Sequence, residues 1–398
     1  MEAAEINKLS QHQFEHVITS DALAALCKQL KNAKVITLDT EFVRTRTLKP
    51  KLGLLQVFDG KHLALIDPIV ICDMEPFCDI LRDESILKVF HSCSEDIDAL
   101  HSNLGVTPSP LFDTQFAASI LSYGASIGYA KLVENFFDIT LDKGESRTDW
   151  IARPLSSKQL SYAAADVTYL MALYERLSAE VQQHDLHSAV LGESEALIQK
   201  KIQAFPSEYA YLQLSNNWKL RGHKLLALKL LAQWRLDVAR EKDIAINFVV
   251  KEAVMYEIAM KMPLDNTQLG TIHGLYGKQL RLYGADIVKL SKQAHSANES
   301  EFCEKPQRLI EFSLHKQATA DIKLIIEKVA EQTNIPIPVL ASKKQISQVL
   351  KWCWFDIDEN ELQGLVPDML NSWRRVLFIE ELEKLFGENR KYETLRSL

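Results

Sequence analysis

Asp39 and Glu41 are the pair of side chains whose types and spacing most directly suggest chemistry. They lie two residues apart in the β-rich run VITLDTEF at 35–42, so both should project from one face of a strand. The preceding residues are mostly apolar, so the strand should be central and buried, where two carboxylates are unfavourable unless a cation neutralises them. Carboxylate oxygens favour hard cations such as Mg²⁺ or Mn²⁺. The alternative is a solvated turn at the strand's end.

Two further segments carry acids that could join this pair. HSCSEDID at 91–98 leaves a β-run and enters a helix, so Asp96 should lie in the first helical turns, where the helix dipole favours a carboxylate. YAAAD at 162–166 places Tyr162 and Asp166 on one helix face, and its three alanines are consistent with close packing against a sheet. Taken singly, Asp96 could merely compensate the dipole, and Tyr162 and Asp166 could be a buried phenol and a surface acid.

An α/β domain must position these side chains. Strands are predicted at 35–42, 54–58, 62–67 and 87–91, with Asp59-Gly60 as the turn of an initial hairpin. Helices are predicted at 21–30, 94–103, 114–121 and 156–177. The last helix has Ser156 as its N-cap, just after Pro154. Strands that alternate with helices in this way indicate a mixed sheet flanked by helices.

Beyond about residue 200 the sequence is typical of helices only. Helices are expected at 224–243 and 253–261, another should begin at Asp265 with Gln268 in a capping box, and Gly284 should mark a boundary. Residues 291–306 suit a linker, and a second helical block follows. IAINFVV at 244–250 resembles IPIPVL at 335–340, and Gly274-Leu275 resembles Gly364-Leu365, which suggests a duplicated module, although chance similarity is the alternative.

Length and composition limit the class of protein. A chain of 398 residues suits two or three domains, and 47% hydrophobic with 25% charged residues excludes disorder as the main state. No secretory signal and no apolar run long enough to span a membrane occur. The six cysteines form no CxxC pair and are expected to be reduced thiols. We therefore expect a cytoplasmic protein with no membrane contact.

The charge of the chain is unevenly distributed. The net charge of −7 excludes a uniformly basic coat, yet residues 1–200 sum to −10, residues 201–290 to +5 and residues 291–398 to −2. The basic segment could hold a phosphate backbone, or its charges could form the solvated face of an amphipathic helix. Its cations and the aromatic residues between them are Lys219, Arg221, Lys224, Lys229, Arg235, Arg240 and Lys242, with Trp218 and Trp234.

Together, the four acids and the tyrosine form a recognisable set. In the order Asp-x-Glu, Asp and Tyr-x-x-x-Asp, they resemble the three exonuclease motifs of the DEDD superfamily, in the subclass with tyrosine in the third motif. The strings LDTEF at 38–42, HSCSEDI at 91–97, FDTQFAA at 112–118 and DWIARPLSSKQLSYAAADVTYL at 149–170 are similar to those of the bacterial ribonuclease D family. The resemblance extends over essentially the whole chain.

The resemblance also implies the architecture. It implies an α/β ribonuclease H-like exonuclease domain, a mixed sheet flanked by helices, at 1–195. Two all-α domains of the HRDC type (helicase and RNase D C-terminal) would follow at 210–292 and 305–398, the second resembling the family more loosely. HRDC domains elsewhere bind nucleic acid or protein, so both uses stay open for these two.

By the same resemblance, the chain is a 3′→5′ exoribonuclease that uses two divalent metal ions, Mg²⁺ or Mn²⁺, and releases nucleoside 5′-monophosphates. Two metals can serve both ends of an in-line displacement. The family pattern gives Asp39, Glu41 and Asp166 the metal that activates water, with Asp39 bridging, and has Asp96 support the second metal, directly or through water. Tyr162 would orient the water, because a phenol with a pKa of about 10 is a poor base at neutral pH.

Five residues near the motifs are candidates for binding substrate: Gln56, His91, Arg147, Trp150 and Arg153. The arginines suit phosphate and the indole could stack on a base, whereas the glutamine and the histidine could contact substrate or orient a carboxylate. Each has a plain structural alternative as a surface charge, a packed indole or a satisfied core residue. Asp113 is expected chiefly to cap the helix that begins at Thr114.

The resemblance favours a monomer that trims tRNA precursors and other small structured RNAs at single-stranded 3′ ends. Two other functions stay open. One is a DNA exonuclease related to the Werner-type enzymes, which the lack of a GxxxxGK[ST] pattern weakens without excluding. The other is a catalytically silent RNA-binding scaffold, against which the presence of all four acids and the tyrosine argues.

Overall fold

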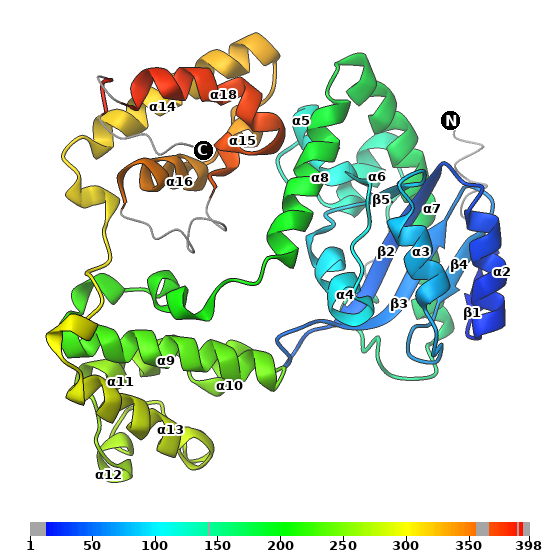
Figure 1. The fold of residues 1–398 in the computed structure, drawn as a ribbon. Coiled ribbons are helices and arrows are strands. Elements are labelled where there is room, and N and C mark those ends of the chain that lie inside the picture. The colour runs from blue at the N-terminus through cyan, green and yellow to red at the C-terminus, as the bar shows by residue number, and fades with distance from the viewer. Residues whose placement is uncertain (1–12, 142–143, 356–365, 388–389, 393–398) are drawn as a thin grey trace.

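The N-terminal part of the protein is a six-stranded mixed sheet flanked by helices, and the rest of the described chain is helical (Figure 1). The computed structural model describes residues 13–141, 144–355, 366–387 and 390–392. The strand order is β1-β4-β3-β2-β5-β6, in which β2, β3 and β4 are antiparallel and β1, β5 and β6 are parallel to their neighbours. The strands are β1 (Glu15–Val17), β2 (Val35–Val43), β3 (Lys51–Phe58), β4 (Leu63–Ile66), β5 (Leu87–Phe90) and β6 (Leu111–Asp113).

The four predicted strands and the predicted hairpin are confirmed. The hairpin turn forms because Asp59 Oδ1 accepts hydrogen bonds from the backbone N–H groups of Lys61 (2.8 Å) and His62 (2.6 Å), and because Gly60 adopts a φ of 91°. The sequence prediction missed β1 and β6. Each has only three residues, too few for a periodic pattern to appear.

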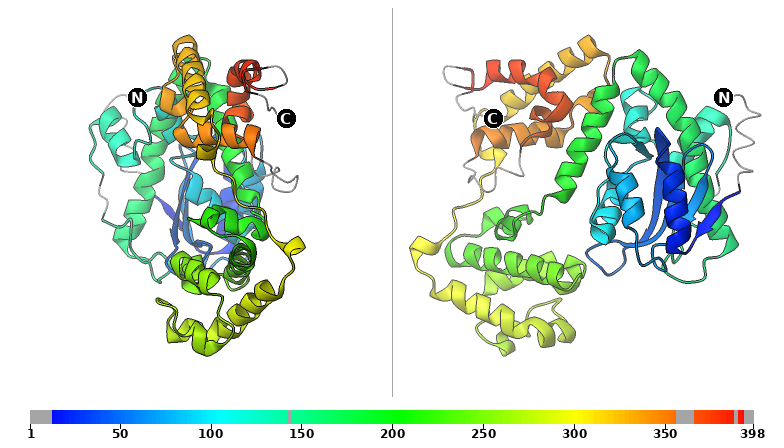
Figure 2. Two further views of the ribbon diagram at one scale, coloured as in Figure 1. Left: turned by 90° about the vertical axis from the view of Figure 1, so that its left-hand side faces the viewer. Right: turned by 45° about the vertical axis from the view of Figure 1, so that its right-hand side comes forward.

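Helices cover both faces of the sheet (Figure 2). The first core cluster lies between the sheet and α2, α3 and α4, and another lies where α7 crosses β3 and β4 on the opposite face. The helix predicted at 156–177 is confirmed with Ser156 as its N-cap, in a capping box with Gln159, and it continues to Gln183. The helices of this part are α2 (Ser20–Leu30), α3 (Glu75–Arg82), α4 (Ser94–Leu104), α5 (Thr114–Ile120), α6 (Tyr129–Phe137), α7 (Ser157–Gln183) and α8 (His187–Ile202).

Residues 207–296 form a first helical module. A long helix, a four-residue helix and a third helix follow one another around their own core. The prediction of a boundary at Gly284 is wrong, because this glycine lies inside α13 where a side chain would press on Asn266 and Leu280. The elements are η1 (Ser207–Gln213), η2 (Asn217–Lys219), α9 (Gly222–Glu241), α10 (Ile246–Val249), α11 (Glu252–Lys261), α12 (Asn266–Leu269) and α13 (Gly277–Ser296).

Residues 315–355 and 366–385 form a second helical module with the same opening order: long helix, four-residue helix, third helix. The short helices α10 and α15 coincide with the two similar strings, which supports the duplication; Gly364-Leu365 lies outside the described residues. The linker predicted at 291–306 begins later than expected, because α13 continues to Ser296. The remaining elements are η3 (Glu299–Glu301), η4 (Leu309–Glu311), α14 (His315–Thr333), α15 (Ile337–Leu340), α16 (Lys343–Trp354), η5 (Asp368–Leu370) and α18 (Ser372–Leu385).

Both helical modules are attached to the sheet domain. In the loop between β2 and β3, the Lys49 N–H donates to Asp243 Oδ1 (2.9 Å) and the Arg46 carbonyl accepts from the Ala245 N–H (2.9 Å). The second module packs α18 on α8, where Arg374 pairs with Glu193 and Trp373 Nε1 donates to the same carboxylate (2.8 Å). The strand that carries Asp39 and Glu41 therefore ends in a loop that the first module holds.

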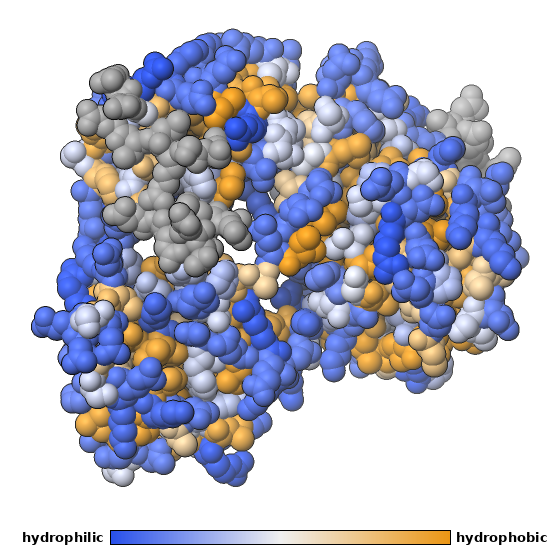
Figure 3. All heavy atoms as spheres, in the orientation of Figure 1, coloured by the Kyte–Doolittle hydropathy of each residue, from blue (hydrophilic) through white to orange (hydrophobic). Residues whose placement is uncertain are grey.

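The visible surface is mostly hydrophilic, with apolar residues in smaller areas between polar ones (Figure 3). Within the described part of the chain, no helix combines the length and the apolar character that crossing a membrane requires.

Candidate active site

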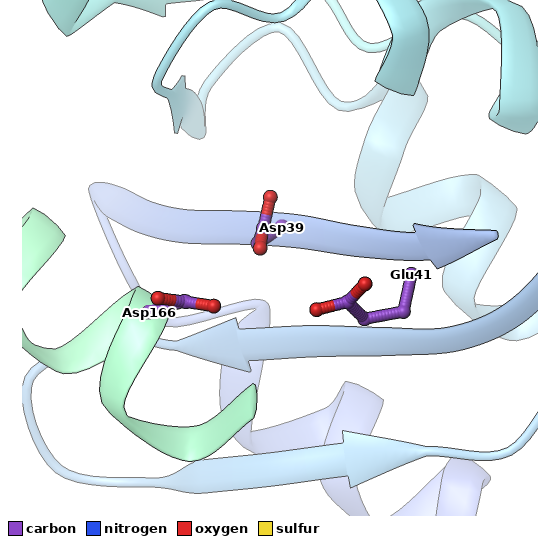
Figure 4. Close-up of side chains that lie close together, drawn as sticks. All are labelled: Asp39, Glu41 and Asp166. Carbon is purple, nitrogen blue, oxygen red and sulfur yellow. The ribbon is translucent and has the colours of Figure 1, made fainter. Parts of the chain in front are cut away.

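Three carboxylates meet where α7 crosses β2. Ligand oxygens of Asp39, Glu41 and Asp166 all lie within 4.8 Å of one another, and Figure 4 shows the three side chains turned toward a common space. The two strand residues share a face because side chains alternate along β2, as the sequence predicted. Thr37 lies on the same face of β2, two residues before Asp39. Its Oγ1 donates to the Val167 carbonyl of α7 (2.8 Å) and so joins the strand to the helix.

Asp96 approaches this cluster from the other face of the sheet. It lies in the first turn of α4, as predicted, and is buried with 6% exposure. Thr40, which stands between Asp39 and Glu41 and points the opposite way, donates from Oγ1 to Asp96 Oδ1 (2.5 Å). The central threonine of the DTE motif therefore holds the fourth acid, a role that the sequence prediction missed although strand alternation could have suggested it.

The third motif is fixed by packing under α7. Ala163 and Ala164 are buried against the sheet, which brings Tyr162 and Asp166 of the same helix beside β2. Tyr129 of α6 donates from its hydroxyl to the Asp166 carbonyl (2.6 Å). This tyrosine is a further supporting residue that the motif analysis did not single out.

The electrostatics of the four acids are unfavourable without a cation. Burial, with the negative charges of Asp96, Asp166 and Glu41, raises the pKa of Asp39 well above its ordinary range. Burial and the neighbouring acids raise the pKa of Glu41 to about 9. Burial raises the pKa of Asp96 to about 7 and that of Asp166 to about 7, against hydrogen bonds from Thr40 and Tyr162 that lower them.

This donor set fits hard divalent cations. All the donors are carboxylate oxygens, and ligand oxygens of three of the acids lie within 4.8 Å of one another. Among the described residues, no salt bridge involves Asp39, Glu41, Asp96 or Asp166. A cation from solution would relieve the repulsion that the described chain leaves in place.

Asp113 caps α5, as expected, and also organises the approach to α4. Its carboxylate accepts from the N–H groups of Gln115 (2.8 Å) and Phe116 (3.4 Å) at the start of α5. It also accepts from the N–H groups of Ser92 (2.9 Å) and Cys93 (3.1 Å), the residues that lead into the helix of Asp96. Its role in this structure is therefore to fix backbone near the site.

Two predicted substrate residues are engaged inside the fold. Arg153 donates from Nε and Nη2 to both oxygens of Asp67 (2.6 and 2.8 Å) and from Nη2 to the Gly53 carbonyl (2.6 Å). Trp150 is only 1% exposed, packed under α7 with its ring centroid 6.2 Å from that of Tyr162. Trp150 is covered by the fold, whereas Arg153 is engaged by Asp67 but stays partly exposed, so a substrate role for either residue remains a prediction.

The other three predicted substrate residues differ in their surroundings. The ring nitrogens of His91 lie 3.0 Å from Thr114 Oγ1 and 3.1 Å from the Ile127 carbonyl, so the ring is held by the fold. Arg147 is exposed, and its side chain has no partner among the described residues. Gln56 is fully buried directly opposite Asp39.

A cavity of about 520 Å³ opens beside the third motif. On one side, the cavity is lined by two rows of α7 residues, each row spaced four residues apart along the helix. On the other side, it is lined by residues that precede α7. Lys158 heads the row that contains Tyr162 and Asp166, is exposed, and has no partner among the described residues. The lining residues are Leu141, Gly144, Glu145, Ser157, Lys158, Ser161, Tyr162, Ala165 and Asp166. The sequence analysis missed Lys158, although its spacing of four from Tyr162 is a visible signal.

Comparisons with known proteins agree with this architecture. A family model described as 3′-5′ exonuclease matches residues 14–182, an HRDC domain model matches residues 225–290, and a model described as the C-terminal HRDC domain of ribonuclease D matches residues 314–382. Ribonuclease D of Musicola paradisiaca is 40% identical over 374 residues, which cover 94% of this chain and 99% of that protein. Ribonuclease D of Escherichia coli is 40% identical over 375 residues, with coverage of 94% and 99%.

Solved structures show the same likeness. The crystal structure of Escherichia coli RNase D, described as an exoribonuclease involved in structured RNA processing, superposes with a TM-score of 0.88 at 40% identity, over 94% of this chain and 98% of that chain. The catalytic core of RRP6 from Trypanosoma brucei shares the fold, with a TM-score of 0.59 at 24% identity over 71% of this chain and 80% of that chain.

Proposed function

The chain belongs to the ribonuclease D family and carries a 3′-5′ exonuclease domain, and from these premises we propose that it trims the 3′ ends of tRNA precursors and other small structured RNAs. The observation that carries the chemistry is the convergence of Asp39, Glu41 and Asp166 within 4.8 Å, with Asp96 held behind them by Thr40. The products are nucleoside 5′-monophosphates, and the proposed activity takes place in the cytoplasm, where tRNA precursors mature.

The four acids would hold two divalent ions, Mg²⁺ or Mn²⁺. Asp39, Glu41 and Asp166 would hold one ion, and Asp96 with Asp39 would hold the second, directly or through water. When bound, such ions lower the pKa of a coordinated water and neutralise the charge that develops on the attacking and leaving oxygens. Thr40 and Tyr129 keep Asp96 and Asp166 in place for this purpose.

Tyr162 would orient the attacking water. Burial and the negative charges of Asp166, Glu41 and Asp39 raise the pKa of its phenol, so the hydroxyl keeps its proton at neutral pH. That proton is donated to Asp166, which leaves the oxygen lone pairs to accept a hydrogen bond from the water. A water held in this way directs its own lone pair toward the phosphorus.

The cavity beside Tyr162 and Asp166 would receive the single-stranded 3′ end. Lys158 and Asp166 are eight residues apart on α7, about 12 Å along the helix axis. A cation at that distance suits a phosphate upstream of the scissile one, since an RNA 3′ end carries no phosphate beyond its last nucleotide. Arg147 is another exposed cation near the third motif.

The first helical module would provide part of the grip on RNA, by a monomer. Its predicted basic residues are not equivalent. Arg235 is buried and donates from Nη1 to the Val250 carbonyl (3.1 Å). The side chains of Arg221 and Lys224 are not buried and have no partners among the described residues. Changing Arg221 and Lys224 together to glutamate in the full chain should weaken RNA binding and flatten its salt dependence. Unchanged affinity would instead favour a protein partner for this module.

The function is tested with a 3′-tailed tRNA and a matched single-stranded DNA, each with Mg²⁺ or with EDTA. We expect mononucleotide release from the 3′ end of the RNA with Mg²⁺ and none with EDTA. Preferential release from DNA would support a DNA exonuclease instead. Binding of RNA without release would support a silent scaffold.

A further inference from the structure

Gln56 is a buried polar side chain whose partner the fold does not supply. It lies in the middle of β3 with 0% exposure, and neither Oε1 nor Nε2 has a hydrogen-bond partner among the described residues. Burying an amide without hydrogen bonds is unfavourable, and the great majority of buried polar groups in folded proteins are paired. The Gln56 amide therefore needs a hydrogen-bond partner that the metal-free chain does not provide. That partner is either a bound ligand or a protein group that changes its orientation when a ligand binds.

The neighbours of Gln56 indicate which group can be the hydrogen-bond partner of its amide. Gln56 stands directly opposite Asp39 on β2 and opposite Leu65 on β4. Cross-strand partners lie with their Cβ atoms about 4.5–5.5 Å apart and share one face of the sheet. Leu54 and Phe58 flank the glutamine along its own strand, and both belong to the apolar cluster under α7. The polar side chain directly across the strands from Gln56 is therefore the carboxylate of Asp39.

We propose that Gln56 is a positioning residue for Asp39: its amide N–H donates to the Asp39 carboxylate when that carboxylate binds a divalent cation. The inference rests on the proposed function, because it requires a cation at Asp39. A carboxylate has about four lone-pair sites, so a metal ligand retains sites that an amide can fill. Carboxylates that bind metals are themselves usually hydrogen-bonded, and those partners fix their orientation.

The chemistry of the amide suits this task better than a charged group would. An arginine opposite Asp39 would neutralise the acid and compete with the cation, as Arg153 neutralises Asp67 elsewhere in the sheet domain. A neutral N–H orients the carboxylate and leaves its negative charge available to the metal. An apolar residue would pack more easily among Leu54, Phe58 and Leu65 but would leave Asp39 without this support.

Direct contact between Gln56 and RNA does not fit its position. The side chain is fully covered, with β2 and β4 on either side and α7 above. Of the two functional roles that the sequence left open, substrate contact and orientation of a carboxylate, the position of Gln56 favours the second, with Asp39 as the carboxylate. An ordinary structural role does not fit either, because it would require a hydrogen bond within the fold.

The test is the near-isosteric substitution Gln56→Met, with Leu65→Met as the matched control on the other side of the same position. In EDTA, Gln56→Met should raise the Tm by about 2–4 °C, because an unpaired amide is replaced by an apolar group. Titration calorimetry with Mn²⁺ alone should show binding weakened about tenfold or more. Leu65→Met should leave Mn²⁺ affinity unchanged.

Higher stability together with weaker Mn²⁺ binding supports the proposal. A lower Tm with normal Mn²⁺ binding, a higher Tm with normal binding, or no change in either quantity overturns it. Failure of both Gln56→Met and Gln56→Leu to fold also overturns it, because the amide would then support the fold. These measurements use no RNA, so they are separate from the proposed function; a wild-type protein that binds no Mn²⁺ would contradict the function itself.

Discussion

Two buried acidic sites in the sheet domain are built in opposite ways. Asp67, which follows β4, is 1% exposed, and both of its oxygens accept hydrogen bonds from Arg153. The carboxylates of Asp39, Glu41 and Asp166 converge where α7 crosses β2, and no salt bridge among the described residues reaches them. One site contains its own counter-ion, and the other gathers several acids without one.

The difference separates a structural acid from acids that bind a cation from solution. A buried carboxylate is tolerated when a cation and hydrogen bonds compensate for its lost hydration. Asp67 receives that compensation inside the chain, whereas the cluster on β2 and α7 shows raised pKa values, caused by burial and by mutual repulsion. Burial alone would not distinguish the two sites, but the presence or absence of an internal cation does.

The largest expected effect follows from removing a charge at the unpaired site. Asp39→Asn should reduce hydrolysis of a 3′-tailed RNA by at least about 10⁴-fold, about 5.5 kcal/mol in the activation free energy, because the bridging ligand is lost. Its metal-free form should be as stable as wild type or more so, since one repelling charge is gone. Mononucleotide release and thermal unfolding in EDTA measure the two effects. Full activity in Asp39→Asn, or in Asp96→Asn or Asp166→Asn, would contradict the assignment.

The same substitution of aspartate by asparagine should lower the stability at Asp67, the acid that is paired with Arg153. Asp67→Asn removes the counter-ion of the partly buried Arg153 guanidinium, which should lower the free energy of unfolding by about 1.5–3 kcal/mol. Urea unfolding in EDTA measures the loss, and the double variant with Arg153→Met should lose less than the sum of the single variants. If Arg153→Met kept normal stability but raised KM for RNA, the predicted substrate role of Arg153 would be correct.

The raised pKa values predict how pH affects the metal-free protein. Burial and the neighbouring acids raise the pKa of Glu41 to about 9 in the fold, whereas the unfolded chain keeps the ordinary pKa, so the native state binds the proton more tightly between those values. Stability in EDTA should therefore fall as pH rises from about 5 to 9. Glu41→Gln should remove at least about 1.4 kcal/mol of that fall, the equivalent of one pKa unit. An equally steep fall in Glu41→Gln would show that other groups cause it, and added Mn²⁺ should reduce the fall in wild type.

The comparison also shows what could be predicted from the sequence. The strand with Asp39 and Glu41, the helix with Tyr162 and Asp166, and the cap at Ser156 follow from local patterns of two and four residues. The prediction that these segments form one site came from their resemblance to the family motifs and not from the local patterns. The partner of Arg153 was missed because Asp67 lies 86 residues away, and only the folded sheet places the two side chains in contact.

The burial of Trp150 illustrates the same limit. The position of Trp150 before the third motif suggested base stacking. In the fold, however, the Trp150 backbone packs so closely on Gly53 that a Cβ added to Gly53 would lie 2.4 Å from the Trp150 carbonyl oxygen. The glycine and the tryptophan are complementary only in the folded protein. Side-chain direction within a strand was predictable, whereas the choice between core and surface for a loop residue depended on distant contacts.

Tyr162, the neutral hydrogen-bond donor beside the acids on β2 and α7, should have a smaller effect on the rate than Asp39. Tyr162→Phe removes the hydroxyl that donates to Asp166 and would hold the water, and should reduce kcat by about 10- to 100-fold. Mn²⁺ affinity should stay near the wild-type value, because the four carboxylates remain. Single-turnover rates and titration calorimetry separate these quantities. A rate equal to wild type would leave Tyr162 with packing alone.

The smallest effect is expected at Lys158, the exposed cation in the cavity that contains Tyr162 and Asp166. This lysine forms no ion pair with any acid in the described part of the chain, so the comparison assigns its charge to the substrate. A dinucleoside monophosphate carries only the scissile phosphate, whereas a trinucleoside diphosphate carries one more phosphate upstream. Lys158→Ala should therefore raise KM about 3- to 5-fold for the trinucleotide and leave the dinucleotide unchanged, because one phosphate contact is lost. Equal losses on both substrates would place Lys158 at the scissile phosphate, and no loss on either would leave it as a solvated surface charge.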